Sequence, residues 1–459
     1  MGLVFLGFIP LKGQDLRERI RKEITKFESD SQMRHAALGL FVVESNTGKP
    51  VFEKNAQLGL APASCQKVIT ATTAFELLGK DFRYKTEFRY NGRVSDSLLR
   101  GNIYIIGSGD PSLGSWRYAS TSADPVGKAL AESLHSHGIY RMEGGLVSVN
   151  YGFETQAIPG GWIWEDIGNY FGAGSYCVNW RENQYDLILK PGMNIGDSVS
   201  ILNYRPALHI KLENELNTGP VESGDNSIIY FSPGRSQGYI HGTIPCCVDS
   251  FVISGAVADG ELFALGQLGE ILTEKGFSPS SASIQNKKSN LYDYNSRPLF
   301  VHLSPSLDSI VYWFLKKSIN LYGESLLKTL AHEKSGFGSI EGGIDLIHQF
   351  WEQNGLDRSA LVIMDGSGLS PQNRVTPYAL VRVMRFARTK PWFRYFYDAL
   401  PEINGIKMKS GSIEGVRSYT GYIRSKSGKE YTFAIIVNNF DGSSGPLVKK
   451  IWRVLDILK

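Results

Sequence analysis

Residues 61 to 67 read Ala61-Pro62-Ala63-Ser64-Cys65-Gln66-Lys67. Pro62 suits a helix start, and the Ala-, Thr- and Leu-rich run that follows ends before Gly79, so we expect a helix from Ala63 to Leu78. Ser64 and Lys67 are three residues apart, which places both side chains on one face of that helix. A lysine amine of lowered pKa can take the serine proton there, and the free N–H groups of the first turn favour developing negative charge.

Two later segments give this short pattern its meaning. Ser318-Ile319-Asn320 lies in an aromatic-rich region with helical character, and Lys409-Ser410-Gly411-Ser412 begins an expected strand. The order Ser-x-x-Lys, Ser-x-Asn, Lys-Ser-Gly is typical of serine acyl transferases that act on β-lactams and on peptides ending in D-alanyl-D-alanine. Each element alone is common, but the three in this order on these segment types are improbable by chance.

With these motifs, the chain resembles the S13 peptidases, the low-molecular-mass class C penicillin-binding proteins that act as D-alanyl-D-alanine carboxypeptidases and endopeptidases. The resemblance covers nearly the whole chain and includes the long insertion between Lys67 and Ser318. Further segments that carry it are 99–102 (LRGN), 109–113 (GDPSL), 161–166 (GWIWED), 304–307 (SPSL) and 365–370 (DGSGLS).

The resemblance implies a role for each motif residue. Ser64 is expected to be the nucleophile, Lys67 its proton acceptor, and Ser318 the relay of a proton to the leaving amine. Backbone N–H groups of Ser64 and Ser412 are expected to form the oxyanion hole. The expected substrate-binding residues are Asn320, Lys409, Ser410, Gly411 and Ser412, with Lys409 and the two hydroxyls on the terminal carboxylate, and Gly411 leaving room for the substrate backbone.

Two positions depart from the family pattern. The third motif carries Ser410 where threonine is commoner, and the retained hydroxyl predicts retained function. Asn150 stands where the family usually has an aspartate that binds the free amine of a diaminopimelate side chain, so we expect Asn150 in that subsite without the charge. Glu154 is an alternative for the same role.

The pattern of elements predicts an α+β protein, in which both ends of the chain form a helix-plus-sheet domain that a large β-rich insertion interrupts. The resemblance implies that this domain has a penicillin-binding or β-lactamase-like transpeptidase fold, an antiparallel sheet flanked by helices. Helices are expected over 307–330, 340–354 and 447–459, and strands over 406–413 and 421–438. The predicted domains are a catalytic domain of residues 15–82 and 288–459, an inserted domain II of 83–193 and 247–287, and a small domain III of 194–246.

Composition excludes several classes of protein. The 459 residues are 42% hydrophobic and 20% charged, with a net charge of +4, which disfavours a disordered chain, a coiled coil and a dedicated nucleic-acid binder. The four cysteines lack metal-ligand spacing, so neither a disulfide scaffold nor a zinc site is expected. No metal or cofactor is implied. The expected partners are peptidoglycan stem peptides and, as covalent inhibitors, β-lactam antibiotics.

The first residues bear on location. The apolar run from Leu3 to Leu11 is about half of what a membrane-spanning helix needs, so no span is predicted. It is either the apolar part of a secretory signal, with residues 1–14 as its remnant, or a disordered terminus. Because peptidoglycan lies outside the cytoplasm, the resemblance favours export to the periplasm or cell envelope.

Two other functions compete with a peptidase. A β-lactamase shares the acylation step, but no convincing Glu-x-x-Leu-Asn segment supplies a deacylating base, and the insertion has no purpose there. A penicillin-sensing or wall-binding protein without turnover is the non-enzymatic alternative, and it ranks lower because all three motifs retain their reactive groups.

Overall fold

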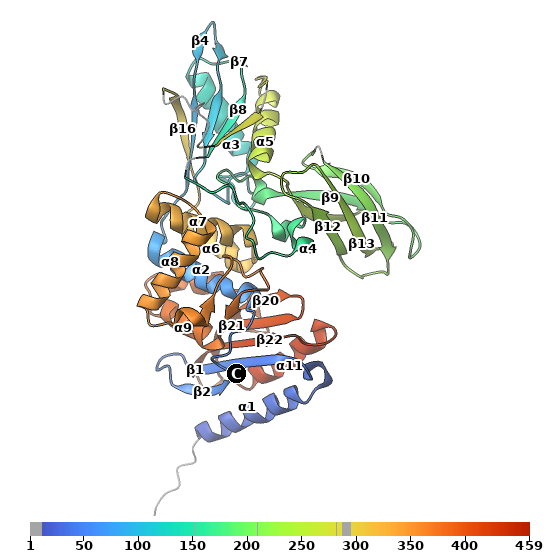
Figure 1. Cartoon of the computed structure of the whole chain (residues 1–459), viewed down its shortest axis with the longest axis vertical. Coiled ribbons are helices and arrows are strands. Elements are labelled where there is room, and N and C mark those ends of the chain that lie inside the picture. The colour runs from blue at the N-terminus through green and yellow to red at the C-terminus, as the bar shows by residue number, and fades with distance from the viewer. Residues whose placement is uncertain (1–11, 151, 209, 281, 287–294) are drawn as a thin grey trace, which may run out of the picture. The chain divides into compact units, whose positions relative to one another are not determined.

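A computed structural model describes the chain except residues 1–11, 151, 209, 281 and 287–294 (Figure 1). The segment from Leu3 to Leu11 therefore lies outside the described residues. The chain divides into two compact units. Unit 1 comprises Met1–Thr72, Phe350–Ile363 and Pro371–Lys459, and unit 2 comprises Thr73–Gln349 and Met364–Ser370. Among the described helices, none is long and apolar enough to cross a membrane.

Unit 1 is built on a six-stranded antiparallel sheet that both ends of the chain contribute to, as the sequence predicts (Figure 1). Its order is β19 (Glu402–Ile403), β20 (Ile406–Ile413), β21 (Val416–Arg424), β22 (Glu430–Asn438), β1 (Ala37–Glu44) and β2 (Pro50–Lys54). The single strand expected over 421–438 is wrong, because a turn with Gly428 at φ +81° separates β21 from β22.

Helices cover both faces of this sheet. One face packs on α1 (Lys12–Glu28) and α11 (Ser444–Asp456) through a shared apolar core. Ile20, Ile24 and Phe27 of α1 are spaced by four and three residues, which places them on one helical face, and all three are buried in this core. The helix α9 (Pro377–Arg388) lies against β1 and β22, followed by α10 (Phe393–Ala399). Because alternate strand residues face opposite ways, burial of every residue from Tyr431 to Asn438 shows that both faces of β22 are covered.

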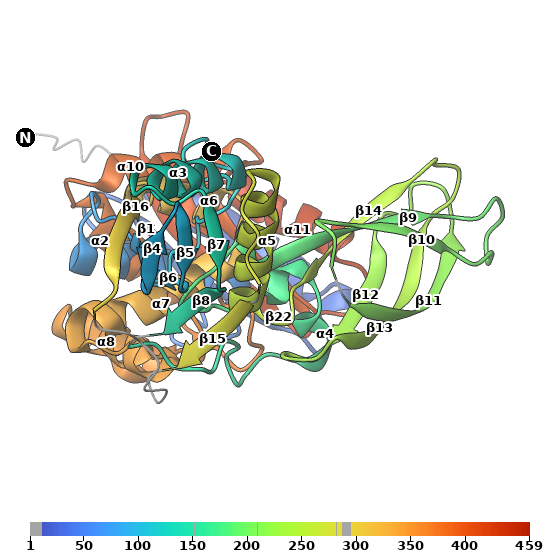
Figure 2. The same cartoon turned by 90° about the horizontal axis from the view of Figure 1, so that it is seen from above.

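Unit 2 contains a mixed five-stranded sheet, seen from above in Figure 2. Its order is β15 (Ala282–Asn286), β8 (Leu146–Asn150), β6 (Ile103–Ile106), β3 (Lys85–Tyr90) and β16 (Arg297–Leu303). The helices α3 (Ala123–Ser136) and α5 (Gly260–Glu274) pack on it around one apolar core. The strands β4 (Arg93–Ser95), β5 (Leu98–Arg100) and β7 (Arg141–Glu143) form a separate three-stranded sheet and come between strands of the five-stranded sheet in the sequence.

Two three-stranded sheets form a second core within unit 2. One consists of β10 (Ser200–Arg205), β9 (Gln184–Lys190) and β14 (Phe251–Ala256), and the other of β11 (Lys211–Gly219), β13 (Gln237–Pro245) and β12 (Asn226–Phe231). Leu187 and Ile253 of the first share apolar contacts with Ile229 and Ile240 of the second. The predicted boundaries of domains II and III subdivide unit 2 further, and they stay a prediction.

The long helix expected over 307–330 is wrong in one respect. Two helices, α6 (Leu307–Lys316) and α7 (Asn320–Ser335), flank a break in which Ser318 has φ +59°. Helical periodicity continues through the break, which hides it in the sequence. The remaining elements are η1 (Ser31–Met33), η2 (Ala63–Gln66), α2 (Lys67–Leu78), α4 (Trp164–Ile167), η3 (Tyr170–Gly172), η4 (Arg181–Asn183), α8 (Ile340–Gln353), η5 (Arg358–Ala360), β17 (Leu361–Val362) and β18 (Arg374–Val375).

Candidate active site

The Ser64 turn has tighter geometry than the expected α-helix. Residues Ala63–Gln66 form the 3₁₀ turn η2, and the α-helix α2 begins at Lys67 and ends before Gly79, which has φ +80°. In a 3₁₀ turn, side chains three residues apart eclipse one another. Lys67 Nζ accordingly lies 2.9 Å from Ser64 Oγ as a hydrogen-bond donor. A serine and an amine in direct contact are the pair that nucleophilic catalysis requires.

The backbone leading into this turn is strained and clamped. Ala63 has φ +44°, a left-handed conformation that a non-glycine residue adopts at an energetic cost, and such residues concentrate at functional sites. Asn438, at the end of β22, accepts from Ala61 N at 2.8 Å and donates to Ala61 O at 3.1 Å. These reciprocal bonds hold the chain where it enters the turn. No sequence motif points to Asn438, and only the fold places it there.

The Lys409 strand runs directly beside the Ser64 turn. Within the described strands, β19 pairs only with Ile406 and Lys407, so from Lys409 onward β20 has β21 as its single strand partner. A Cβ atom added to Gly411 would lie 2.5 Å from Pro62 O and 3.0 Å from Cys65 N. The protein's own backbone therefore occupies the space that a side chain needs. This requirement adds to the substrate-approach role expected for Gly411.

The side chain of Lys409 is buried. It is 1% exposed, and Nζ donates to Ser410 O at 2.7 Å. Desolvation lowers the pKa of Lys409 to about 8, because burial penalises the charged amine more than the neutral one. Below pH about 8 this amine is charged, and an anion bound at the neighbouring strand segment would stabilise the buried charge.

Cys65, next to the serine in sequence, is a structural residue. It is fully buried, and its thiol donates to Lys409 O at 3.2 Å, so it links the Ser64 turn to β20. Desolvation raises the pKa of Cys65 to about 11. Because the thiolate is the nucleophilic form, this thiol is poorly suited to attack.

Ser318 and Asn320 belong to unit 2. Ser318 occupies the left-handed break between α6 and α7, and Asn320 is the first residue of α7. Asn320 is 7% exposed, and its Nδ2 donates to Phe171 O of η3 at 2.8 Å. The structure thus brings Ser64, Lys67, Lys409 and Gly411 together in unit 1, and it carries the Ser-x-Asn motif on unit 2.

The side chains of Asn150 and Glu154, the two candidates for the amine subsite, both accept hydrogen bonds from backbone N–H groups. Asn150 ends β8, is 5% exposed, and its Oδ1 accepts from Phe153 N at 3.2 Å. Glu154 Oε1 accepts from Ile340 N at 2.7 Å and lies 3.6 Å from the buried Lys328 Nζ. The role of Asn150 toward a substrate stays a prediction.

Two of the family-like segments meet in the interior of unit 2. Asp365 Oδ2 accepts from Trp162 Nε1 at 2.9 Å and from Ser370 N at 2.6 Å, and Oδ1 accepts from Gly368 N at 2.7 Å. Glu324 of α7 accepts from Gly366 N at 2.9 Å. The 365–370 segment is therefore a hydrogen-bonded turn that packs against α7 and the 161–166 segment.

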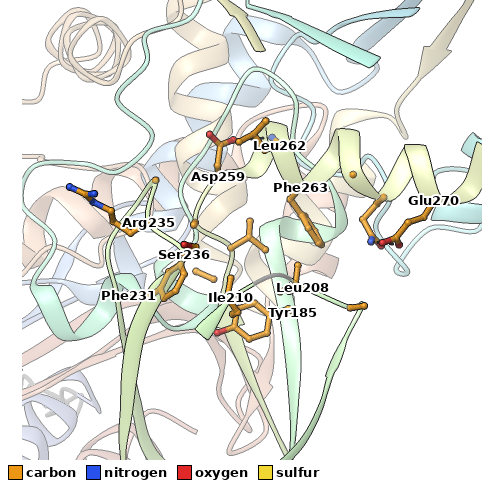
Figure 3. A pocket seen from close by; sticks show the side chains of 17 residues that line it. Tyr185, Leu208, Ile210, Phe231, Arg235, Ser236, Asp259, Leu262, Phe263 and Glu270 are labelled. Atoms are coloured by element: carbon orange, nitrogen blue, oxygen red, sulfur yellow. Dashed lines mark hydrogen bonds between the residues drawn. The ribbon is translucent and has the colours of Figure 1, made fainter. Parts of the chain in front are cut away.

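A cavity of about 520 Å³ in unit 2 contains none of the predicted site residues (Figure 3). Its walls are mainly apolar, with Leu208, Ile210, Phe231 and Phe263 around it, and Arg235 at the surface. It lies where α5 meets the second core of unit 2. No pairing of nucleophile and base occurs among its lining residues, so the motifs and not this cavity define the candidate active site.

Comparisons with known proteins agree with the motifs. The family model described as "D-Ala-D-Ala carboxypeptidase 3 (S13) family" matches residues 20–405 and 402–455. A D-alanyl-D-alanine carboxypeptidase of Actinomadura sp. (strain R39) is 24% identical over 463 residues, covering 93% of this chain and 82% of the relative.

A crystal structure of penicillin binding protein 4 (dacB) from Haemophilus influenzae has a TM-score of 0.79 at 20% identity and covers 97% of this chain and 99% of that chain. A structure of the same H. influenzae protein in complex with a β-lactam has a TM-score of 0.75 at 20% identity, covering 96% and 99% of the two chains. The similarity establishes the α+β fold of penicillin-binding proteins for this chain.

Proposed function

The chain belongs to the D-Ala-D-Ala carboxypeptidase 3 (S13) family and is a serine DD-peptidase, and on this premise we propose that Ser64 is its nucleophile and Lys67 its base. The observation that carries the proposal is the 2.9 Å contact between Lys67 Nζ and Ser64 Oγ in a strained turn beside β20. When Lys67 is neutral, its Nζ can accept the proton of Ser64 Oγ across the same contact.

The proposed reaction has two stages. Ser64 Oγ attacks the carbonyl carbon of the penultimate D-alanine, Lys67 takes the proton, and the backbone N–H groups of Ser64 and Ser412 stabilise the oxyanion. Collapse of the tetrahedral intermediate breaks the peptide bond, and Ser318 relays a proton to the departing D-alanine amine. Water then hydrolyses the acyl-enzyme and regenerates Ser64.

Substrate binding uses the remaining motif residues. Lys409 supplies positive charge for the terminal carboxylate, and the Ser410 and Ser412 hydroxyls hydrogen-bond it. The part of β20 that pairs only with β21 supports this assignment, since an extended peptide binds well along an open strand edge. Asn320 serves a substrate amide, to which its side chain can both donate and accept.

The biological substrates follow from the reaction. We expect the enzyme to act on terminal D-alanyl-D-alanine of peptidoglycan stem peptides and also on D-alanyl crosslinks between them. The complex of the H. influenzae protein with a β-lactam supports binding of β-lactams by this chain, and acylation of Ser64 is the inhibition that the proposed mechanism implies. Because peptidoglycan is extracytoplasmic, the proposed location is the periplasm or cell envelope.

The test combines covalent labelling with product release. Wild-type protein is expected to bind one equivalent of fluorescent penicillin and to release D-alanine from monomeric and crosslinked muropeptides. Ser64→Ala is expected to do neither. Cys65→Ala is the matched control from the same turn, and it is expected to keep one equivalent of label because the thiol is buried.

Two outcomes would contradict the proposal. Labelling of Ser64→Ala at wild-type stoichiometry would place the nucleophile elsewhere. Nitrocefin turnover far beyond one equivalent, without D-alanine release, would identify a β-lactamase instead.

A further inference from the structure

A strained segment of unit 2 has no role in the reaction described so far. Arg181, Glu182 and Asn183 have φ of +50°, +57° and +53°, three successive left-handed residues without a glycine. This conformation is unfavourable for residues with a Cβ atom and persists only where surrounding contacts enforce it. Asn183 supplies such contacts, since its Nδ2 donates to Gly174 O at 2.8 Å and its Oδ1 accepts from Trp180 N at 3.0 Å.

The strain directs the Glu182 carboxylate into the interior, where it is 1% exposed. It accepts five hydrogen bonds from four side chains, namely Ser115 Oγ at 2.8 Å, Arg117 Nε at 2.7 Å and Nη2 at 3.2 Å, Gln184 Nε2 at 3.2 Å and Tyr322 Oη at 3.0 Å. Burying a charge is costly unless it is paired and hydrogen-bonded, and this one is both. The carboxylate is therefore a fixed point in unit 2.

This fixed point is connected to both helices that flank Ser318. Tyr322 lies on α7, two residues after Asn320, and donates directly to Glu182. Arg117, paired with Glu182, stacks its guanidinium 5.4 Å from the ring centroid of Trp313 on α6. Ser318 lies in the break between these two helices. A shift of either helix would change the direction of its hydroxyl.

We propose that Glu182 is a positioning residue of the peptidase, which orients Ser318 and Asn320 by anchoring α6 and α7 to one buried carboxylate. The proposal rests on the proton-relay role given above to Ser318. Its chemical consequence is specific. A misdirected Ser318 hydroxyl slows cleavage of a substrate whose leaving group must be protonated, such as a peptide amine. A thioester substrate releases a thiolate, which departs without that proton.

The experiment measures kcat/KM for a D-Ala-D-Ala peptide and for a matching thioester. The concentration of active enzyme in each variant is determined by titration with penicillin. Glu182→Gln keeps the shape but removes the charge that pairs with Arg117. Tyr322→Phe removes the hydroxyl through which α7 contacts Glu182, together with the hydrogen bonds of that hydroxyl to Tyr118 and Ser115. Both are expected to lower the peptide-to-thioester ratio at least about tenfold, since a positioned acid contributes about 100-fold or more. Tyr322→Phe decides the question if Glu182→Gln fails to fold.

Two reference variants separate positioning from loss of stability. Glu261→Gln alters another carboxylate in unit 2, 4% exposed and bonded to Ser148 Oγ at 2.7 Å, and is expected to lower Tm while leaving the ratio unchanged. Ser318→Ala is expected to lower the ratio as Glu182→Gln does. If Ser318→Ala lowers the peptide-to-thioester ratio but Tyr322→Phe and Glu182→Gln leave it unchanged, the proposed role of Glu182 is wrong and the relay role of Ser318 stands. An unchanged ratio in Ser318→Ala overturns the relay itself, and the inference with it.

Discussion

Gly411 lies so close to Pro62 that a Cβ atom on the glycine would stand 2.5 Å from the proline carbonyl oxygen. The two residues are about 350 positions apart in the chain, yet their contact sets the distance between β20 and the turn that carries Ser64. The motif glycine is thus a packing requirement of the enzyme itself.

Gly411→Ala is expected to push β20 away from the Ser64 turn. Displacement of reacting groups by about 1 Å can cost about 100-fold in rate, so we expect a loss of that order in kcat/KM for D-alanine release. Overpacking is also expected to cost about 1–3 kcal/mol of stability, measurable by denaturant unfolding. Gly415→Ala is the control, because Gly415 lies at φ +65° in the turn after β20 and a Cβ atom there would come near no residue of the Ser64 turn. Wild-type kcat/KM in Gly411→Ala would show that the packing is not required.

The buried amine of Lys409 predicts an alkaline limit to activity. Below pH about 8 the amine is charged, and above it the neutral form dominates, so binding of a terminal carboxylate weakens as pH rises. We expect kcat/KM for a free-acid peptide to decline through pH about 8, and to decline less for its carboxyl-amidated analogue. Lys409→Arg should move this decline to higher pH, because a guanidinium stays charged. Identical profiles for both substrates would show that Lys409 does not bind the terminal carboxylate.

Asn438→Ala is expected to release the chain that enters the Ser64 turn. The substitution leaves the N–H and C=O of Ala61 without their partner, at a cost of about 1–3 kcal/mol per buried group. The rate of acylation by penicillin should fall, because the left-handed conformation of Ala63 is no longer enforced. Stopped-flow acylation together with thermal unfolding measures both effects. A lower Tm with an unchanged acylation rate would show that the clamp serves stability only.

Asn150→Asp tests the amine subsite. The aspartate keeps the oxygen that Phe153 N contacts and adds a charge, and charge-assisted hydrogen bonds are about twice as strong as neutral ones. We expect kcat/KM to rise by the equivalent of about 1 kcal/mol for stem peptides with a free side-chain amine. The rise should be smaller for the N-acetylated peptide. If the ratio between the two peptides stays constant, Asn150 lies outside the subsite and Glu154 becomes the candidate.

Local patterns determined much of this protein in advance. The three-residue spacing of Ser64 and Lys67 predicts their contact because residues three apart meet on any helical turn, α or 3₁₀. The α1 face and the strand at 406–413 follow from periodicity in the same way. The order of the three motifs indicated the family, which the family model confirms.

Tertiary structure alone decided how these pieces are held. Asn438 reaches Ala61, and Glu182 reaches Tyr322, across 377 and 140 positions of sequence respectively. Periodicity describes only which face of an element is buried, so it carries no information about partners so distant in the chain. The break at Ser318 is hidden for a related reason, because serine has no preference for the left-handed conformation that would mark it in the sequence. A polar side chain such as that of Asn438 or Glu182 can hold a distant segment only when the fold brings a hydrogen-bond partner next to it. That placement depends on the packing of all the elements together.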